Sequence, residues 1–328
     1  MEMKRGKIPE TILKRSILKQ RKHRRSEVIQ GALPGLDATI VDMKETEEMV
    51  ISINPVIGEL KGLPDQVVHT TANNIWVQGG EPIGILTSIL LPENTKEEEL
   101  RDFTQKLEKI CESLNIEIMG GHTEVASIPR PIITVTGIGK RKKKGTQRIS
   151  TLRPSLELVM TRFAGQEGTA ILAREKKREL KTRYTEEYLE KAYCENQGIS
   201  VFDAVKVAGE NGVTVMHDVT GGGIFGALWE LGSAYQVGFS VDLKKIPIRQ
   251  ETIEICEFFD LNPYMLTSRG CLLMVSEHGN ELVQKLSEAK IEAAVIGRIT
   301  ENKDKQIVNE DEIRFLDSPK EEELLKVL

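Results

Sequence analysis

The chain has 328 residues, of which 39% are hydrophobic and 29% are charged, and its formal net charge is -5. This length accommodates two domains of about 150 residues, each with a core of its own. The modest negative charge argues against general binding to nucleic acid. The longest apolar runs, such as 85–91, are far shorter than the roughly 18 residues of a membrane-spanning helix.

The N-terminus is charged and contains no apolar segment of the kind that directs secretion, which favours a cytoplasmic location. The cysteines show no CxxC spacing and lie in or beside apolar or helical patterns. This is typical of reduced structural thiols rather than of a metal site. The four cysteines are Cys111, Cys194, Cys256 and Cys271.

Two basic runs stand out. The first 25 residues carry ten Lys or Arg and two Glu, with apolar residues at helical spacing, and they predict a basic amphipathic helix. It could contact a polyanion such as a nucleotide tail, but we favour an ordinary solvated helix face. The second run, 140–145, predicts a hairpin tip or linker, and we place the domain boundary there, giving domains 1–150 and 151–328.

The patterns along the chain predict an α/β or α+β protein. In the first domain, strands are expected at 38–41, 49–53, 83–90 and 132–138, and helices at 65–78 and 96–114. In the second, a strand at 156–161 precedes helices from about 168, at 186–193 and at 201–210. Further regular segments are expected at 239–243, 251–259, 271–275, 280–289 and 293–299, with a final packed helix at 324–328.

A glycine turn at 216–223 carries the clearest chemical signal. The β-branched run 213–215 leads into it, and apolar residues at helical spacing follow it, so the pattern reads as strand, glycine turn and helix. The first N–H groups of a helix have no partner within the helix, which makes such a turn suitable for binding an anion. Asp218 and Thr220 add polar side chains at its mouth. The alternative is an ordinary tight turn capped by Thr220.

Other polar clusters are weaker when taken alone. A second glycine turn is predicted at Gly120–Glu124, directly after a short strand at 116–119. Asn73 and Asn74 lie inside a helix-like segment, where consecutive Asn residues are unfavourable, so we expect their amides to make contacts. The segment 35–38 leads into a strand.

Together these motifs resemble the aminoimidazole-ribonucleotide (AIR) synthetase superfamily, also called PurM-like. The match is closest to the HypE branch of hydrogenase expression/formation proteins, and it covers nearly the whole chain in order. The matching motifs are Gly-Lys-Ile-Pro (6–9), Gly-Leu-Asp-Ala (35–38), Ile-Asn-Pro (53–55), Ala-Asn-Asn-Ile (72–75), Gly-Gly-Glu-Pro (79–82), Gly-Gly-His-Thr-Glu-Val (120–125), Ala-Gly-Gln-Glu-Gly-Thr-Ala-Ile-Leu-Ala (164–173), His-Asp-Val-Thr-Gly-Gly-Gly (217–223) and Ile-Gly-Arg-Ile-Thr (296–300).

The resemblance implies a PurM-like fold of two domains: an N-terminal mixed-sheet domain that binds ATP and dimerises, and a C-terminal α/β domain. It implies a homodimer that binds ATP with Mg2+. It further implies activation of a carbonyl or amide-type oxygen by phosphoryl transfer, on a small molecule or on a group carried by a partner protein.

The resemblance also assigns residues. It places the nucleotide against Asp37, Asn54, Asn73, Asn74, Gly120, Gly121, His122, Thr123 and Glu124, with Asp37 and Glu124 on the metal. It places the substrate or phosphate against Gly165, Glu167, Gly168, Gly221, Gly222 and Gly223, and it gives the catalytic positions to His217, Asp218 and Thr220.

The sequence departs from the family pattern at three acidic positions. The motif usually written Thr-Asp-Pro is Ile53-Asn54-Pro55, Asn-Asp-Ile is Asn73-Asn74-Ile75, and a Gly-Gly-Asp-Thr form is Gly120-Gly121-His122-Thr123. Mg2+ prefers carboxylates, whereas Asn offers a neutral oxygen and imidazole is a poor ligand for so hard an ion. Two functions therefore stay open: an ATP-dependent enzyme with an unidentified substrate, and a non-catalytic homodimer that binds a nucleotide or phospho-ligand and has lost Mg-dependent turnover.

The end of the sequence differs from the HypE branch as well. That branch ends in a Pro-Arg-Ile-Cys tail whose thiol carries the carbamoyl group, whereas this sequence ends Leu324-Leu325-Lys326-Val327-Leu328. We therefore do not expect carbamoyl transfer onto a thiol of its own tail.

Overall fold

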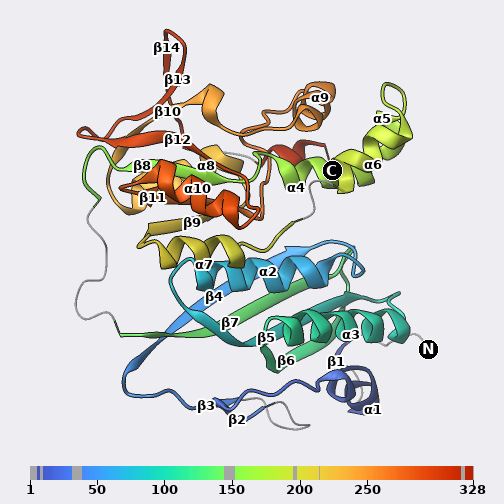
Figure 1. Ribbon diagram of the computed structural model, residues 1–328. Helices are drawn as coiled ribbons and strands as arrows, with labels where there is room; N and C mark the ends of the chain where they lie inside the picture. The colour runs from blue at the N-terminus through green and yellow to red at the C-terminus, as the bar shows by residue number, and fades with distance from the viewer. Residues whose placement is uncertain are drawn as a thin grey trace. The chain divides into compact units, whose positions relative to one another are not determined.

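The structure is a computed structural model that describes residues 6–7, 10–31, 39–143, 152–194, 198–213, 215–318 and 322–327. The chain divides into two compact units, unit 1 (Met1–Gly145) and unit 2 (Thr146–Leu328). Their helices and strands are labelled in Figure 1. No helix in these ranges is both long and apolar enough to cross a membrane.

Unit 1 is built on a five-stranded sheet with the order β1-β6-β5-β7-β4. Strands β5 and β6 run parallel, and every other neighbouring pair is antiparallel. A separate small sheet pairs β2 with β3. The strands are β1 (Gly6–Lys7), β2 (Val28–Gln30), β3 (Ile40–Val41), β4 (Glu47–Ile57), β5 (Glu81–Pro92), β6 (Glu117–Ala126) and β7 (Ile132–Lys142).

Two helices cover one face of this sheet, as Figure 1 shows: α2 (Leu63–Trp76) and α3 (Glu97–Ser113). Their apolar faces supply much of the core, including Val67, Ile75 and Leu107. Because side chains alternate along a strand, β4 turns every second residue to the opposite face. There the apolar side chains of Met49, Ile51, Ile53 and Ile57 remain exposed.

The strands predicted at 49–53, 83–90 and 132–138 and the helices at 65–78 and 96–114 are confirmed, and of the strand predicted at 38–41 the described part is β3, whereas the predicted turn at Gly120–Glu124 is wrong. These residues lie within β6. Gly121 has φ +149°, and a Cβ there would overlap the carbonyl oxygen of Thr87 on β5. A register irregularity between Ile85 and Leu86 accompanies this close approach. The glycine pair thus permits two backbones to pack tightly rather than reversing the chain.

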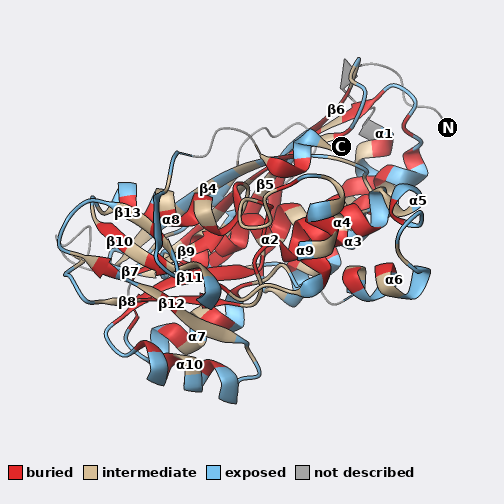
Figure 2. Cartoon of the chain, turned by 90° about the horizontal axis from the view of Figure 1, so that it is seen from above, coloured by how far each residue is buried: buried red, intermediate tan, exposed pale blue. Residues whose placement is uncertain are grey.

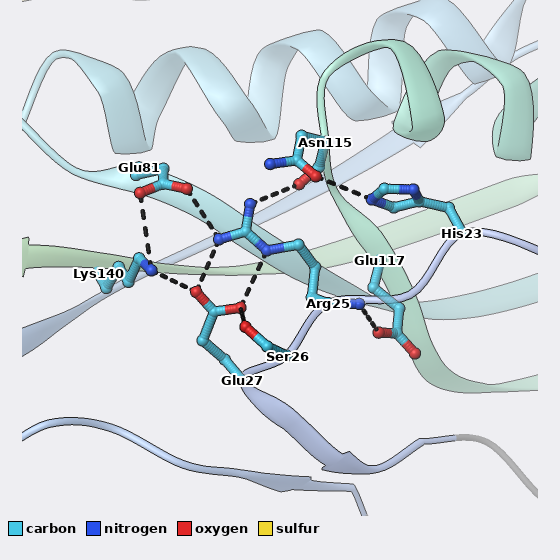
Figure 3. A network of polar contacts seen from close by, with 8 residues as sticks. All are labelled: His23, Arg25, Ser26, Glu27, Glu81, Asn115, Glu117 and Lys140. Carbon is cyan, nitrogen blue, oxygen red and sulfur yellow. Dashed lines mark hydrogen bonds and ion pairs between the residues drawn. The ribbon is translucent and has the colours of Figure 1, made fainter.

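The basic N-terminal segment is less helical than predicted. It forms only α1 (Glu10–Ile12), the π-helical η1 (Leu13–Ile17) and the 3-10 turn η2 (Leu18–Gln20). The following residues are held on the sheet by carboxylates, as Figure 3 shows. Arg25 Nη2 donates to Glu27 and Glu81 at 2.8 Å each, and its backbone N–H donates to Glu117 Oε2 at 2.6 Å.

Lys140 joins the same network, pairing with Glu27 and lying 3.8 Å from Glu81. The prediction of a hairpin tip or linker is wrong for residues 140–142, because they form the end of β7. Arg141 likewise pairs with Glu48 at 2.7 Å. This internal pairing favours the packed, solvated interpretation of the basic segments over contact with a polyanion.

Unit 2 contains a seven-stranded sheet with the order β14-β13-β10-β12-β8-β11-β9. The strands are β8 (Glu157–Thr161), β9 (Val215–Val219), β10 (Gly238–Asp242), β11 (Cys271–Ser276), β12 (Ala293–Thr300), β13 (Lys305–Asn309) and β14 (Glu312–Phe315). The helices are α4 (Gln166–Glu175), α5 (Lys177–Leu180), α6 (Glu186–Cys194), α7 (Phe202–Glu210), α8 (Gly223–Ala234), α9 (Gln250–Phe258) and α10 (Gly279–Glu288), with 3-10 turns η3 (Leu243–Lys245) and η4 (Glu323–Lys326).

Two apolar clusters stabilise unit 2. The larger lies between α8 and the sheet and includes Leu228, Leu273 and Phe239. The smaller joins α4, α6, α9 and the C-terminal η4, through Leu172, Ile255 and Leu324. Helix α10 buries Leu282 and Leu286 and leaves its outer side exposed (Figure 2).

Two predictions change in detail. Strand β9 continues through His217 and Asp218, so the glycine turn is only Thr220–Gly222. The final helix is the 3-10 turn η4 rather than an α-helix at 324–328. Extended backbone at His217 and Asp218 is favoured because β9 pairs with β11 over this whole stretch, with Leu272 opposite Asp218.

Candidate functional site

In unit 1, the two Asn residues that replace expected carboxylates contact each other. Asn54 lies on β4 and Asn74 on α2, and both Nδ2 groups donate to the hydroxyl of Ser52, at 3.0 Å and 2.9 Å. Asn74 Nδ2 also lies 3.4 Å from Asn54 Oδ1. Side-chain amides and a hydroxyl thus form a small neutral cluster between strand and helix.

His122 and Glu124 form a second pair on β6, with Nε2 and Oε2 3.3 Å apart and both side chains nearly half exposed. The strand register places Glu124 in one row across the sheet with Leu90, Ile132 and Ile57. It places Asn54 in a row three residues away, with Val135, Thr87 and Gly121. Since side chains alternate along a strand, an odd separation puts the two rows on opposite faces, so the His122–Glu124 pair lies on the open face and Asn54 on the helix-covered face.

These two pairs do not form one cluster within unit 1. Strands β4 and β6 are separated by β7 and β5, so at about 4.8 Å per strand step they lie roughly 14 Å apart. Asn73 is buried in α2 and Thr123 is buried on β6. Asp37, with the rest of the segment 35–38, lies outside the described residues, so its predicted role as a metal and nucleotide ligand stays a prediction.

The donors that are described in unit 1 do not fit Mg2+. Mg2+ requires hard oxygen ligands in octahedral geometry, mainly carboxylates and water. The Ser52–Asn54–Asn74 cluster contains no carboxylate, and Glu124 is paired with an imidazole. In the described ranges, no group of three or more His, Cys, Asp or Glu could hold a metal ion. Whether Mg2+ binds at these positions therefore stays a prediction.

In unit 2, three segments far apart in the sequence converge. The start of α4, the glycine turn before α8 and the segment 266–270 before β11 are joined by direct hydrogen bonds. The N–H of Gly165 donates to Ser268 Oγ at 2.7 Å, the N–H of Gly168 to the carbonyl of Thr267 at 3.0 Å, and the N–H of Ser268 to the carbonyl of Thr220 at 3.4 Å. The structure thus brings the predicted substrate residues of 165–168 and 221–223 together.

A partly buried ion pair lies at this junction. Arg269 Nη1 donates to Glu167 Oε1 at 2.8 Å, and Thr267 Oγ1 donates to Glu167 Oε2 at 2.8 Å. Burial disfavours the charged Arg269, but Glu167 outweighs burial and raises the pKa of the guanidinium, with smaller contributions from Glu322 and Asp218. Sequence reasoning named Glu167 but missed Thr267 and Arg269. The available signal was a polar Thr-Ser-Arg-Gly run directly before the apolar strand β11.

The glycines of this region have different roles. A Cβ on Gly168 would overlap the side chain of Leu266, and one on Gly223 would meet the carbonyl of Tyr264. Gly165, Gly222 and Gly223 have φ values of +69°, +78° and +60°, in the left-handed region that favours glycine. At Gly221 the nearest neighbour of an added Cβ would be an anionic group, Oε2 of Glu322 at 3.3 Å.

The residues that the resemblance assigns as catalytic, His217, Asp218 and Thr220, lie at the end of β9 and in the turn, and their catalytic role stays a prediction. His217 Nδ1 lies 2.7 Å from the carbonyl oxygen of Asp218, and its Nε2 lies 3.1 Å from Glu230 Oε2. Burial opposes protonation of His217, yet the hydrogen bond to Glu230 raises its pKa overall. Burial raises the pKa of Asp218. Thr220 contributes its carbonyl, which accepts from the N–H groups of Gly223 and Ser268.

Both units match a known family. Residues 35–140 match the family described as "AIR synthase related protein, N-terminal domain", and residues 153–309 match "AIR synthase related protein, C-terminal domain". The chain therefore belongs to the AIR synthase-related, PurM-like superfamily, as its motifs predict.

The individual relatives include HypE proteins and also a thiamine-monophosphate kinase of Pyrococcus horikoshii, which is 26% identical over 256 residues, 76% of this chain and 75% of that relative. The chain is 26% identical over 239 residues to carbamoyl dehydratase HypE of Rhizobium leguminosarum bv. viciae, a match that spans 71% of this chain and 66% of that relative. The fold is similar to the crystal structure of E. coli HypE, with TM-score 0.80, 19% identity and coverage of 96% and 99% of the two chains. It is also similar to HypE in complex with ATP, with TM-score 0.74, 18% identity and 96% of each chain covered.

Proposed function

We propose that this chain is an ATP-dependent enzyme related to HypE, which activates a carbonyl or amide-type oxygen by phosphoryl transfer. The observation that carries the proposal is the family match over both units, together with an ATP-bound solved relative whose fold extends over 96% of this chain. The substrate is a small molecule or a group borne by a partner protein.

The residues of unit 2 suit the substrate side of such a reaction. Phosphoryl transfer depends on positioning and on stabilising negative charge. Arg269 supplies a fixed positive charge that Glu167 orients. The hydrogen bond to Glu230 raises the pKa of His217, so this imidazole can hold or release a proton beside the glycine turn.

In unit 1, Asn54 and Asn74 would contact phosphate oxygens through neutral amides. They offer no carboxylate for a metal, so we expect ATP binding itself to persist when Mg2+ is removed. The test is calorimetric titration of ATP into the full chain in EDTA and in Mg2+, with phosphate release measured in the same samples.

Binding with phosphate release supports the enzyme. Binding without release, across a panel of divalent metals, supports the alternative of a non-catalytic nucleotide- or phospho-ligand-binding homodimer. No ATP binding in either condition overturns both.

We further propose that the chain forms a homodimer through the open face of the unit 1 sheet. Met49, Ile51, Ile53 and Ile57 form an apolar row on β4, with Ile51 and Ile53 more than 60% exposed. An exposed apolar row on a single sheet face is typical of an interface. Because His122 and Glu124 lie on this face, dimerisation would cover the second predicted nucleotide pair as well.

Replacing Ile51 and Ile53 by Lys should convert the dimer to a monomer in sedimentation velocity. Replacing Ile253 by Lys is the control, since this residue is an exposed isoleucine of α9. A wild-type chain that sediments as a monomer at tens of micromolar would contradict the proposal.

A further inference from the structure

The segment 322–327 is held on unit 2 by two structural contacts. Glu323 Oε2 accepts from the N–H of Asn262 at 2.9 Å, and Glu323 is almost fully buried. Leu324 is buried in the apolar cluster of α4, α6 and α9. These contacts place the preceding residue, Glu322, over the glycine turn.

The Glu322 carboxylate lies directly against Gly221. A Cβ built on Gly221 would lie 3.3 Å from Oε2 and 3.4 Å from Cδ of Glu322. Gly221 does not have the positive φ of Gly222 and Gly223. The absence of a side chain at Gly221 therefore allows another group to lie close to the turn, and that group is the Glu322 carboxylate.

Glu322 differs from Glu323 in how its charge is satisfied. Glu323 accepts a backbone N–H and pairs with Lys326 at 2.6 Å. The backbone carbonyl of Glu322 accepts from the N–H of Leu325 at 3.1 Å, but in the part of the chain that the structure describes no hydrogen bond or ion pair of its carboxylate is found. Its carboxylate is partly buried and interacts electrostatically with Arg269 and Glu167, and burial raises its pKa.

Arg269 has capacity for a further partner. One edge of its guanidinium is paired with Glu167, while Nε is buried without a hydrogen-bond partner. The charged groups facing Arg269 are Glu167, Asp218 and Glu322, so three carboxylates surround one cation. An incoming anion that displaced the Glu322 carboxylate would keep the negative charge near Arg269, and it could turn toward the guanidinium.

We propose that Gly221 and Arg269 form a binding site for the oxyanion group, carboxylate or phosphate, of the substrate, and that Glu322 occupies this site in the free chain. The incoming oxyanion displaces Glu322 and with it loosens the segment 322–327. This inference rests on the proposed function for the identity of the site as the substrate side, but oxyanion binding is measured independently of ATP.

The experiment compares the wild-type chain with Glu322→Gln, and with Glu301→Gln as a matched control at an exposed glutamate. Inorganic phosphate and acetate are the probes, titrated by calorimetry without ATP. Removing the competing charge should strengthen phosphate or acetate binding about tenfold in Glu322→Gln, equivalent to about 1.4 kcal/mol. Glu301→Gln should bind both probes with the affinity of the wild type. The probe that binds more tightly indicates whether the site takes a phosphate or a carboxylate.

Two further measurements locate the site. Gly221→Ala in the Glu322→Gln background should abolish the gain, because the new Cβ fills the space against the turn. Hydrogen exchange of 322–327 in the wild type should increase when phosphate or acetate binds. Equal affinities of Glu322→Gln and wild type, or a gain that survives Gly221→Ala, would overturn the proposal.

ATP titration of the same variants separates this inference from the proposed function. If ATP binds normally and Glu322→Gln does not change the affinity for phosphate or acetate, the proposed oxyanion site is contradicted and the proposed function is not. If ATP does not bind but Glu322→Gln still strengthens phosphate or acetate binding, the proposed function is contradicted and the oxyanion site is not.

Discussion

The candidate sites of the two units differ in charge. In unit 1, the positions expected to carry carboxylates form a neutral cluster of Ser52, Asn54 and Asn74. In unit 2, the loops converge on an ion pair between the partly buried Arg269 and the buried Glu167. Both arrangements join residues from separate elements, but only the second would leave a charge buried if one partner were removed.

This difference indicates which properties each site can supply. A neutral amide cluster orients phosphate oxygens through hydrogen bonds, each contributing about 0.5 to 1.5 kcal/mol, and it adds no charge. A guanidinium held by a buried carboxylate supplies fixed positive charge at a defined position. Substitutions in the unit 2 site should therefore change the stability more than substitutions in the unit 1 site. The unit 1 site is the one where new carboxylates can be introduced.

The largest effect is expected from breaking the ion pair. Arg269→Met should lower the free energy of unfolding by about 3 to 5 kcal/mol, because Glu167 is 5% exposed and would keep a buried, unpaired charge. Urea unfolding followed by circular dichroism measures the loss.

The control for that measurement is Arg314→Met, at an exposed arginine of β14, which should change stability by less than about 0.5 kcal/mol. Adding Glu167→Gln to Arg269→Met should recover more than half of the loss. A single variant as stable as the wild type would show that the pair contributes only packing.

A smaller effect is expected from charging the neutral cluster. Asn54→Asp with Asn74→Asp brings two carboxylates together at Ser52 and removes two amide donors, so stability in EDTA should fall by about 1 to 2 kcal/mol. Mg2+ should restore part of it, because carboxylates are ligands that Mg2+ accepts.

Thermal unfolding with and without Mg2+ checks this prediction, with Asn309→Asp, at an exposed position of β13, as the control. If the double variant gains nothing from Mg2+, the cluster does not have the geometry of a metal site. The same double variant would then also fail to acquire metal-dependent phosphate release.

The sequence predicted most elements of both units but not the strands β2, β13 and β14. Periodicity reports local conformation, so α2, α3 and the long strands could be placed within a few residues. What it could not report is long-range pairing. Gly121 was interpreted as a turn because its need for glycine comes from Thr87, which lies on another strand.

Charged residues were misplaced for the same reason. The sequence around Lys140 is typical of a solvated linker, whereas in the structure Lys140 pairs with Glu27, which is 113 positions away. The sequence around Arg269 gives no local sign of its ion pair, because its partner Glu167 is 102 positions away. Residue types identified the candidate motifs, but which of them converge depends on sheet register and loop packing that no local pattern contains.

The smallest effect, and the one that most sharpens the contrast between a charged and a neutral site, concerns His217. Burial disfavours its protonated form, but Glu230 raises its pKa above the ordinary value. A raised folded-state pKa stabilises the fold fully below the unfolded-state value of about 6.5 and ceases to do so as pH rises through the folded value. Glu230→Gln should therefore destabilise the protein at pH 5.5 and have almost no effect at pH 8.5.

The magnitude should be below about 1 kcal/mol, because the Glu230 side chain is 55% exposed and solvent screens the pair. Urea unfolding at the two pH values measures it, and the NMR titration of His217 should move to lower pH in the variant. Glu288→Gln, which removes an exposed partner of Lys285, should show no such difference between pH 5.5 and pH 8.5. A larger loss at pH 8.5 than at pH 5.5 would mean that Glu230 acts through a group other than the imidazole, and the charged character of the unit 2 site would then rest on Arg269 alone.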